Sequence, residues 1–293
     1  MLVAMFQQVE RFLKTCQSPR TAEGYKNVLS RLIVWLSARG ESFVEVTPST
    51  FEAFLNDQKN WGAVSRHLAF NVTRAFLRWQ YGEEHALAHV RKKRPKSKPQ
   101  PTITQPQFEK LLEFFDTSTP IGARDLALFS LAAETGLRAS ALCNLKLRDL
   151  HLESLTLVAL DKGREGGDWR MCKISPPVAN FLFAWLAHRE RIALPETETV
   201  FCSVYGKKKG LANNRFGLLS RCREISEKVG FKFTPHVFRR FMATSMLELQ
   251  ASTIATMRQG GWTDEKEFRK YIATYQLRDV SDYSAVVEYL KKG

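Results

Sequence analysis

A basic, proline-containing segment divides this chain into two parts. Residues 91–101 read RKKRPKSKPQP, with six basic residues, three prolines and no apolar side chain. Proline fixes φ and lacks a backbone N–H, so such a segment forms neither a helix nor a buried strand. The length of 293 residues favours two cores. We therefore predict a first domain over residues 1–88, a linker over 89–103 and a second domain over 104–293.

The charge of the chain indicates a polyanionic partner. The formal net charge is +14, and lysine and arginine supply most of the sequence-independent affinity of proteins for nucleic acid. Excess charge can also serve solubility alone, and a charged linker can be a solvated tether. The clustering of cations in the linker favours contact with a phosphate backbone. The candidate DNA-binding residues of the linker are Arg91, Lys92, Lys93, Arg94, Lys96 and Lys98.

Helical periodicity dominates the first domain, which we predict to be a small all-helical bundle. Apolar residues recur at the spacing of one helix face. The stripes fall within residues 6–13, 25–36, 48–55 and 64–79. The inward positions expected in the last stripe are Leu68, Val72, Phe76 and Leu77. Arg66 and Arg74 lie on the polar faces and are candidates for DNA contact, although a solvated surface explains them equally well.

The second domain combines helices with a small sheet. Thr104 and Gln107 have the spacing of a capping box and predict a helix start. A second helix over about 123–133 is expected to end near Gly136, a residue suited to a left-handed helix terminus. Two β patterns and a glycine-rich turn between them predict a hairpin over residues 155–174. Further helices are expected over residues 178–191, 213–229 and 235–249, around 254 and from 281 onward. The predicted fold class is mainly α with a small β-sheet: a helical N-terminal domain and an α+β domain.

Five polar residues could together hold one phosphodiester. His236 and Arg239 stand three residues apart at a predicted helix start, where backbone N–H groups attract anions. Trp262 and Tyr271 follow, nine residues apart, and Arg138 lies far upstream. Guanidinium, imidazole and indole groups donate hydrogen bonds to phosphate oxygens, and a tyrosine hydroxyl is a nucleophile. Each residue alone has an ordinary structural explanation, so the combination carries the hypothesis.

Three blocks of the sequence resemble the signature blocks of the tyrosine recombinase family, also called the phage-type integrases. The blocks are TGLRASAL at 135–142, HVFRRFMATSML at 236–247 and GGWTDEKEFRKY at 260–271. Their order and spacing fit the family. The helical first domain and the linker resemble the family's SAM-like core-binding domain. The resemblance therefore implies a catalytic domain over residues 104–293.

The resemblance also implies a role for each candidate residue. Tyr271 would be the nucleophile, and Arg138 and Arg239 would bind the scissile phosphate. His236 and Trp262 would complete the hydrogen bonding of that phosphate. Cationic neighbours are needed because a free tyrosine, with a pKa of about 10, is a poor nucleophile at neutral pH.

Two of the assignments have nearby competitors. Lys162, in the turn after the first β pattern, matches the lysine that the family uses as general acid toward the leaving 5′-oxygen. Arg164 and Lys173 lie in or near the same hairpin and remain alternatives. Tyr275 lies one helical turn beyond Tyr271, but the block spacing favours Tyr271.

The sequence departs from the family pattern at two positions. The family usually has an acidic residue three positions after the first arginine, where this chain has Ala141. Such a carboxylate would orient neighbouring groups, so another group is needed to position Arg138. Trp262 stands where histidine is commoner, and tryptophan keeps one N–H donor.

The resemblance implies site-specific cleavage and rejoining of double-stranded DNA through a 3′-phosphotyrosyl intermediate, as in integration, excision or resolution of mobile or viral DNA. One phosphodiester is exchanged for another, so we expect no cofactor and no metal. Recombination of two duplexes implies a homo-oligomer, a tetramer on DNA. Two alternatives stay open: a degenerate homologue that only binds DNA, which Ala141 suggests, and a type IB topoisomerase.

Cysteine usage and hydropathy suggest where the protein works. The five cysteines are scattered and form no C-x-x-C pair, and no segment approaches the ~18 apolar residues of a spanning helix. We expect no membrane association and a cytoplasmic, nucleoid-associated protein, or a nuclear one for a eukaryotic mobile element or virus. An apolar C-terminal tail helix would dock either on its own domain or on a neighbouring protomer. Its apolar residues are Val280, Tyr283, Val286, Val287, Tyr289 and Leu290.

Overall fold

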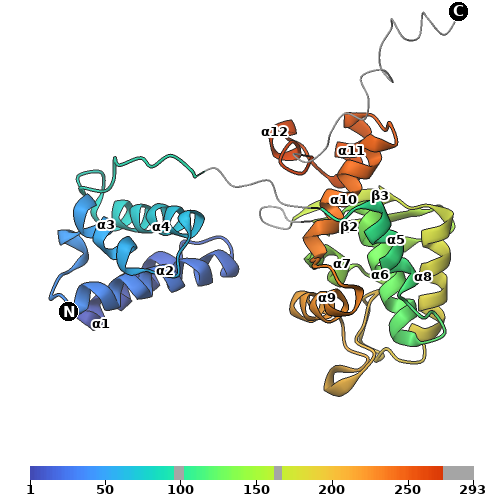
Figure 1. The fold of residues 1–293 in the computed structure, drawn as a ribbon. Helices are drawn as coiled ribbons and strands as arrows, with labels where there is room; N and C mark the ends of the chain where they lie inside the picture. Colours follow the sequence, from blue (N-terminus) through green and yellow to red (C-terminus); the bar gives the residue numbers. More distant parts are fainter. Residues whose placement is uncertain (96–101, 162–166, 273–293) are drawn as a thin grey trace, which may run out of the picture. The chain divides into compact units, whose positions relative to one another are not determined.

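The computed structural model describes residues 1–95, 102–161 and 167–272. The chain forms two compact units, Met1–Lys98 and Pro99–Gly293 (Figure 1). The division between them falls inside the basic segment. Two of the candidate DNA-binding residues, Lys96 and Lys98, lie outside the described residues.

The first unit is a helical bundle. Its helices are α1 (Leu2–Leu13), α2 (Pro19–Ser37), α3 (Pro48–Asp57) and α4 (Ala63–Tyr81), with a short 3₁₀ turn at Phe43–Glu45. Proline occupies the first turn of α2 and of α3, where the missing N–H costs no helical hydrogen bond. The helices enclose an aromatic-rich core that includes Phe43, Phe51, Phe54, Phe70 and Phe76.

One inward position predicted for α4 is wrong. Leu68 is 51% exposed, whereas Val72, Phe76 and Leu77 are buried as expected. The buried residues of α4 begin at Ala69, so the start of this helix extends beyond the core. Helical periodicity identifies the apolar face but does not show where the neighbouring helices end.

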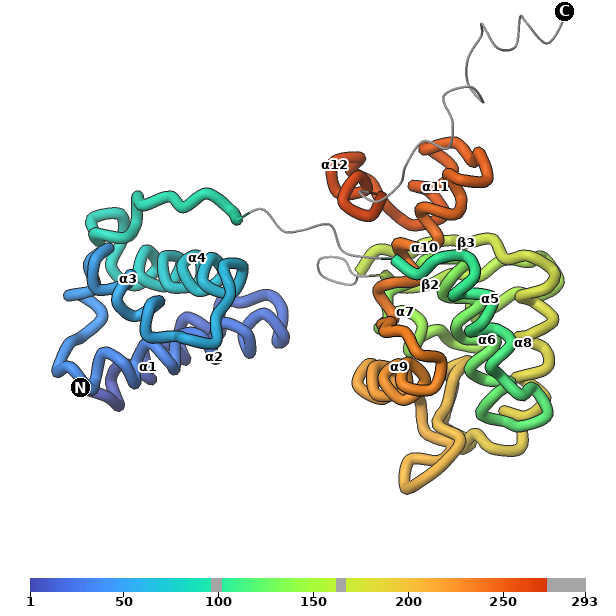
Figure 2. Tube along the Cα trace, in the orientation of Figure 1, coloured from blue at the N-terminus to red at the C-terminus, as the bar shows by residue number. Residues whose placement is uncertain are grey.

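The second unit confirms the predicted mainly α fold class with a small sheet. Thr104 and Gln107 form the expected capping box at the start of α5, with reciprocal hydrogen bonds of 3.3 and 2.9 Å. The helices are α5 (Gln105–Glu113), α6 (Pro120–Thr135), α7 (Ala139–Asn144), α8 (Pro176–Arg189), α9 (Arg215–Val229), α10 (Pro235–Glu248), α11 (Thr253–Gly260) and α12 (Glu265–Phe268). Two 3₁₀ turns lie at Leu147–Asp149 and Gly206–Lys208. The chain path through these elements can be followed in Figure 2.

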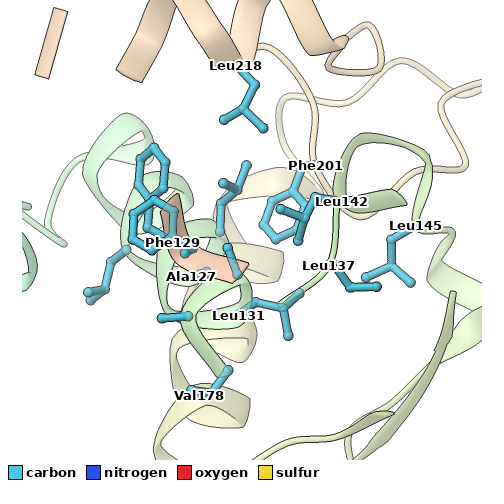
Figure 3. Close-up of a cluster of buried hydrophobic side chains, with 14 of the residues drawn as sticks. Ala127, Phe129, Leu131, Leu137, Leu142, Leu145, Val178, Phe201 and Leu218 are labelled. Carbon is cyan, nitrogen blue, oxygen red and sulfur yellow. The ribbon is translucent and has the colours of Figure 1, made fainter. Parts of the chain in front are cut away.

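Helix α6 is the centre of this unit. Every residue from Gly122 to Ala133 is buried, and the helix packs against α8 and α10. Around it, side chains from α6, α7, α8, α9 and the loops between them form one apolar cluster (Figure 3). Because α6 is packed on all sides, its C-terminal end is held in place. The candidate site begins at that end.

A three-stranded antiparallel sheet lies beside the helices in the order β1-β2-β3. Its strands are β1 (Leu150–His151), β2 (Thr156–Asp161) and β3 (Asp168–Lys173). The register pairs Leu157 with Cys172 and ends with Asp161 opposite Asp168. The hairpin predicted over residues 155–174 is thus present. Neither β1 nor α7 was predicted, because two and six residues are too short to show a period.

Candidate active site

The site starts where α6 ends. Gly136 closes the helix in the left-handed conformation, with φ of 60°. A side chain at this position would place its Cβ 2.5 Å from the Cε atom of Met242. The absence of a side chain leaves room for the end of the Met242 side chain, and the Gly136 carbonyl accepts a 2.9 Å hydrogen bond from Nη1 of Arg239. This glycine therefore sets the position of an arginine more than a hundred residues away in the sequence.

Arg239 is fully buried among aromatic rings. Its Cζ atom lies 4.0 Å from the ring centroid of Trp262 and 5.4 Å from that of Tyr271. A guanidinium over an aromatic face gains from the ring quadrupole, which partly offsets the cost of burying the charge. Within the described residues, Nε and Nη2 of Arg239 have no hydrogen-bond acceptor.

Three arginines meet at one buried carboxylate, Asp161, at the end of β2. Arg138, the residue just before α7, forms an ion pair with Oδ1 of Asp161. Oδ2 of Asp161 lies 3.7 Å from Nη2 of Arg170 and 3.8 Å from Nη1 of Arg239. The two arginines predicted to bind phosphate are thereby brought to the same carboxylate.

The aromatic side of the site gathers the other predicted residues. The ring of Tyr271 lies 4.9 Å from that of Trp262 and 5.3 Å from that of His236, measured between centroids. Trp262 is buried with Phe268, and Tyr271 packs on the edge of this small cluster. Nε1 of Trp262 is buried and has no acceptor within the described part of the chain. The structure thus brings together Arg138, His236, Arg239, Trp262 and Tyr271.

Sequence reasoning missed Arg170 on β3. This buried arginine donates to the carbonyl of Thr135 at 3.1 Å and also to the carbonyl of Gln259, at the end of α11. The amide of Gln259 donates to the Lys173 carbonyl at 2.8 Å. Together these bonds attach the end of α11 to β3 and to the end of α6. The available signal was strand alternation, because position 170 shares the inward face of β3 with the buried Cys172.

The electrostatics of the site favour an anion. Three guanidiniums surround one carboxylate, so the described residues carry excess positive charge. Burial lowers the pKa of Arg239, and the nearby charges of Arg138 and Arg170 lower it further. The pKa of His236 is lowered to about 4 by partial burial and by neighbouring arginines, of which Arg240 contributes most. His236 is therefore a neutral imidazole at neutral pH, able to donate one hydrogen bond and accept another.

Some candidates cannot be placed. Lys162, with its competitor Arg164, and Tyr275 lie outside the described residues. Ala141 is buried in the apolar cluster of the second unit. In the described ranges, no group of three or more histidine, cysteine, aspartate or glutamate side chains could hold a metal ion.

A basic groove lies in the first unit between the end of α4 and the residues that follow it. Its volume is about 690 Å³. Of the predicted DNA-binding residues, Arg74, Arg91, Lys92 and Arg94 line it. Arg66 does not, and instead donates to the Trp61 carbonyl at 3.0 Å. The other polar residues that line the groove are His67, Asn71, Arg78, Glu83 and His89.

Two of the groove's cations are already paired with acidic side chains. Lys92 forms an ion pair with Glu52, and Arg78 forms one with Glu83. Arg94 is exposed, and Nη1 of Arg74 donates to the Val90 carbonyl at 3.0 Å.

No helix within the described ranges combines the length and the apolar character that crossing a bilayer would require.

Comparison with known proteins yields matches across most of the chain. The phage integrase family matches residues 101–278. Tyrosine recombinase XerC of Xanthomonas campestris pv. campestris (strain B100) is 28% identical over 260 residues, which cover 84% of this chain and 77% of XerC. XerH bound to a palindromic difH substrate, in a post-cleavage complex, has a TM-score of 0.73 at 19% identity, covering 96% of this chain and 84% of that chain.

A second solved structure has a similar fold. The lambda integrase tetramer bound to a Holliday junction has a TM-score of 0.67 at 16% identity. The match covers 90% of this chain and 77% of that chain. At these identities the two structural matches establish the fold, and the family match extends over more than half of the chain.

Proposed function

The chain belongs to the phage integrase family, the tyrosine recombinases, and from this membership and the geometry of its site we propose that it cleaves and rejoins double-stranded DNA through a 3′-phosphotyrosyl intermediate. The observation that carries the proposal is the burial of Arg239 against the Tyr271 ring. A buried guanidinium beside a phenol can bind an anion within reach of the phenolic oxygen.

The unsatisfied donors of the site support a phosphate ligand. Buried N–H groups are nearly always hydrogen-bonded, yet within the described residues Nε and Nη2 of Arg239 and Nε1 of Trp262 have no acceptor. A phosphodiester supplies two non-bridging oxygens, which share its negative charge, for these donors. Arg138 and neutral His236 would complete its binding.

The proposed reaction proceeds in two steps, cleavage and rejoining. The oxygen of Tyr271 attacks phosphorus, the bond to the 5′-oxygen breaks, and Lys162 gives a proton to that leaving oxygen. Negative charge that builds up on the pentacoordinate phosphorus is stabilised by Arg138 and Arg239, whose planar guanidiniums match its oxygens. In the second step a 5′-hydroxyl from another strand gives its proton to Lys162 and attacks the phosphotyrosine, and the bond between phosphorus and the Tyr271 oxygen breaks. Neutral His236 can accept and return the phenolic proton.

The comparisons support a role in recombination on a specific site. XerH was solved on its difH substrate and lambda integrase as a tetramer on a Holliday junction. We accordingly propose that this chain acts as a homotetramer on two duplexes. Integration, excision or resolution of mobile or viral DNA are the processes that such a reaction would serve, in the compartment that holds the DNA.

The basic groove of the first unit is our candidate for the DNA backbone. Arg74, Arg91, Lys92 and Arg94 would bind phosphates there. Lys93, which is exposed, and Lys96 and Lys98, which follow, would extend the same contact. Arg66 would contribute on the polar face of α4.

A trapping experiment tests the proposal. DNA sites would be selected from a random library with the Tyr271→Phe variant, which keeps the ring but lacks the hydroxyl. Nicked duplexes of the selected sequence should then trap the wild-type protein as a covalent adduct that resists denaturation. Tyr271→Phe should form none, whereas the matched control Tyr275→Phe should form as much as wild type. Equal trapping by Tyr271→Phe and wild type would refute the assignment.

The trapping assay tests the first alternative, and relaxation of plasmid DNA tests the second. A binding-only homologue would select a DNA site and form no adduct with any nicked substrate. A topoisomerase would relax supercoiled plasmid without a selected site and would act as a monomer.

A further inference from the structure

The three site arginines share a single carboxylate. Asp161 is buried, and its two oxygens face guanidiniums from three different elements: Arg138 before α7, Arg170 on β3 and Arg239 on α10. Guanidiniums cannot lose their charge in proteins, so without a counter-charge they repel each other. Asp161 also opposes the lowering of the Arg239 pKa by its cationic neighbours.

The contacts of Arg239 show how the carboxylate could orient it. Nη1 is held by the Gly136 carbonyl at 2.9 Å and faces Asp161 at 3.8 Å. Nε and Nη2, on the other edge of the guanidinium, have no acceptor within the described residues. One edge is therefore used for anchoring, and the other keeps two parallel N–H groups, the arrangement that binds a phosphate bidentately.

In this chain the carboxylate comes from a strand. Position 141, one helical turn after Arg138, carries a buried alanine on α7 and supplies no charge. Helix α7 packs against β2, and it is the last residue of β2 that reaches Arg138. The strand, and not the helix, delivers the counter-charge.

We propose that Asp161 is a positioning residue, which holds Arg138 and Arg239 in the orientation that binds the scissile phosphate and ties them to Arg170. The proposal rests on the proposed function and deepens it. Asp161 itself does not touch the reacting atoms. It acts through the guanidiniums, so its loss should slow phosphoryl transfer much more than it weakens DNA binding.

A charge-removing variant with a matched control tests this role. Asp161→Asn keeps the size of the side chain and removes its charge. The control is Asp125→Asn, because Asp125 is also buried between two arginines, with bonds of 2.6 Å to Arg124 and 2.7 Å to Arg221. In single-turnover adduct formation at saturating protein, Asp161→Asn should be slower by about 100-fold, as small misplacements of catalytic groups are. Asp125→Asn should stay close to the wild-type rate, and both should bind DNA nearly as well as wild type.

A modified substrate distinguishes positioning of the arginines from an effect on the neighbouring Lys162. With a 5′-bridging phosphorothiolate the leaving sulfur needs no general acid. The defect of Asp161→Asn should persist on this substrate, because the phosphate is still misaligned. A defect that disappears on the phosphorothiolate, or an unchanged rate on the ordinary substrate, would overturn the proposal.

A second variant covers the case in which Asp161→Asn does not fold. Asp161→Glu keeps the charge and lengthens the side chain, which displaces the guanidiniums it holds. Its melting temperature should match that of Asp125→Glu, while its adduct formation should be slower by about 10-fold or more. A wild-type rate in folded Asp161→Glu would count against positioning.

A measurement without cleavage separates this inference from the proposed function. The Nε–H signal of buried Arg239 can be followed by NMR, and its exchange with water should accelerate in Asp161→Asn but not in Asp125→Asn. If wild type never forms an adduct yet this exchange accelerates, the proposed function fails and the positioning role stands. If wild type forms the adduct and Asp161→Asn matches it in rate and exchange, only the positioning role fails.

Discussion

Replacing Gly136 with alanine should cost more stability than the same change at a similar helix end. Gly136 and Gly230 both follow a helix in the left-handed conformation, with φ of 60° and 82°, and both donate a backbone hydrogen bond into the last turn. An added Cβ at Gly136 would lie 2.5 Å from Met242 Cε, whereas at Gly230 nothing lies within 4 Å. Both variants therefore lose the same free energy of unfolding to the left-handed backbone, and they differ in the cost of the contact with Met242.

The magnitudes follow from these two terms. The left-handed conformation costs an alanine about 1–2 kcal/mol at either site, and any gain from stiffening the unfolded chain is also common to both. Crowding against Met242 adds about 1 kcal/mol at Gly136 alone, the low end for overpacking, because Cε is the end of a flexible side chain that can shift. For a unit of this size the difference corresponds to a melting temperature lower by about 2–4 °C in Gly136→Ala than in Gly230→Ala.

Calorimetry of the two full-length variants measures this difference directly. Adduct formation should also fall in Gly136→Ala, because the carbonyl that holds Arg239 belongs to the residue whose left-handed backbone the substitution strains. Gly230→Ala should cleave at the wild-type rate. Equal melting temperatures for the two variants would refute the claim that the missing side chain at Gly136 makes room for Met242.

Two further predictions concern charge. His236, with its pKa lowered to about 4, should stay neutral down to pH 5 in the DNA-free protein. Because the unfolded chain takes up this proton near pH 6.5, the contribution of His236 to stability should fall as the pH drops from about 6.5 to 4. An NMR titration of the imidazole, assigned with His236→Asn, would contradict this with a midpoint at 6 or above. For the groove of the first unit, Arg94→Ala should make the slope of log affinity against log salt shallower by about 0.9, the value for one lost phosphate contact. Arg11→Ala, an exposed change on α1 outside the groove lining, should leave the slope unchanged, and equal slopes for all three proteins would exclude Arg94 from the DNA contact.

Local patterns were sufficient to predict most of the fold. The capping box at Thr104 and the left-handed end of α6 at Gly136 are decided by a few neighbouring residues, so their sequence signals are nearly complete. The hairpin was visible in the same way, because alternation and a glycine-rich turn are local. Leu68 was misplaced because its exposure depends on where other helices end.

The centre of the site was harder to predict. Arg138, Arg239 and Tyr271 were found through the spacing of their blocks, but nothing local reveals that Asp161 lies between the two arginines. That contact depends on the β2–β3 register and on the packing of α7 against β2, both of which are tertiary. One pattern in the sequence did point to Arg170, because strand alternation places it on the inward face of β3. A charged residue on a buried strand face requires a partner.

Arg170 also connects two helices that lead into the candidate site. Its guanidinium donates to the carbonyls of Thr135 and Gln259, so the helix that precedes Arg138, the proposed phosphate ligand, and the helix that precedes Trp262 share one anchor. A neighbouring protomer or a DNA arm that pulled α11 outward would have to break a buried charged hydrogen bond worth about 1.5–3 kcal/mol. Displacement of α11 and loosening of the arginines should therefore occur together, so a protomer in which α11 is displaced would lose the proposed nucleophile and the proposed phosphate site in a single step.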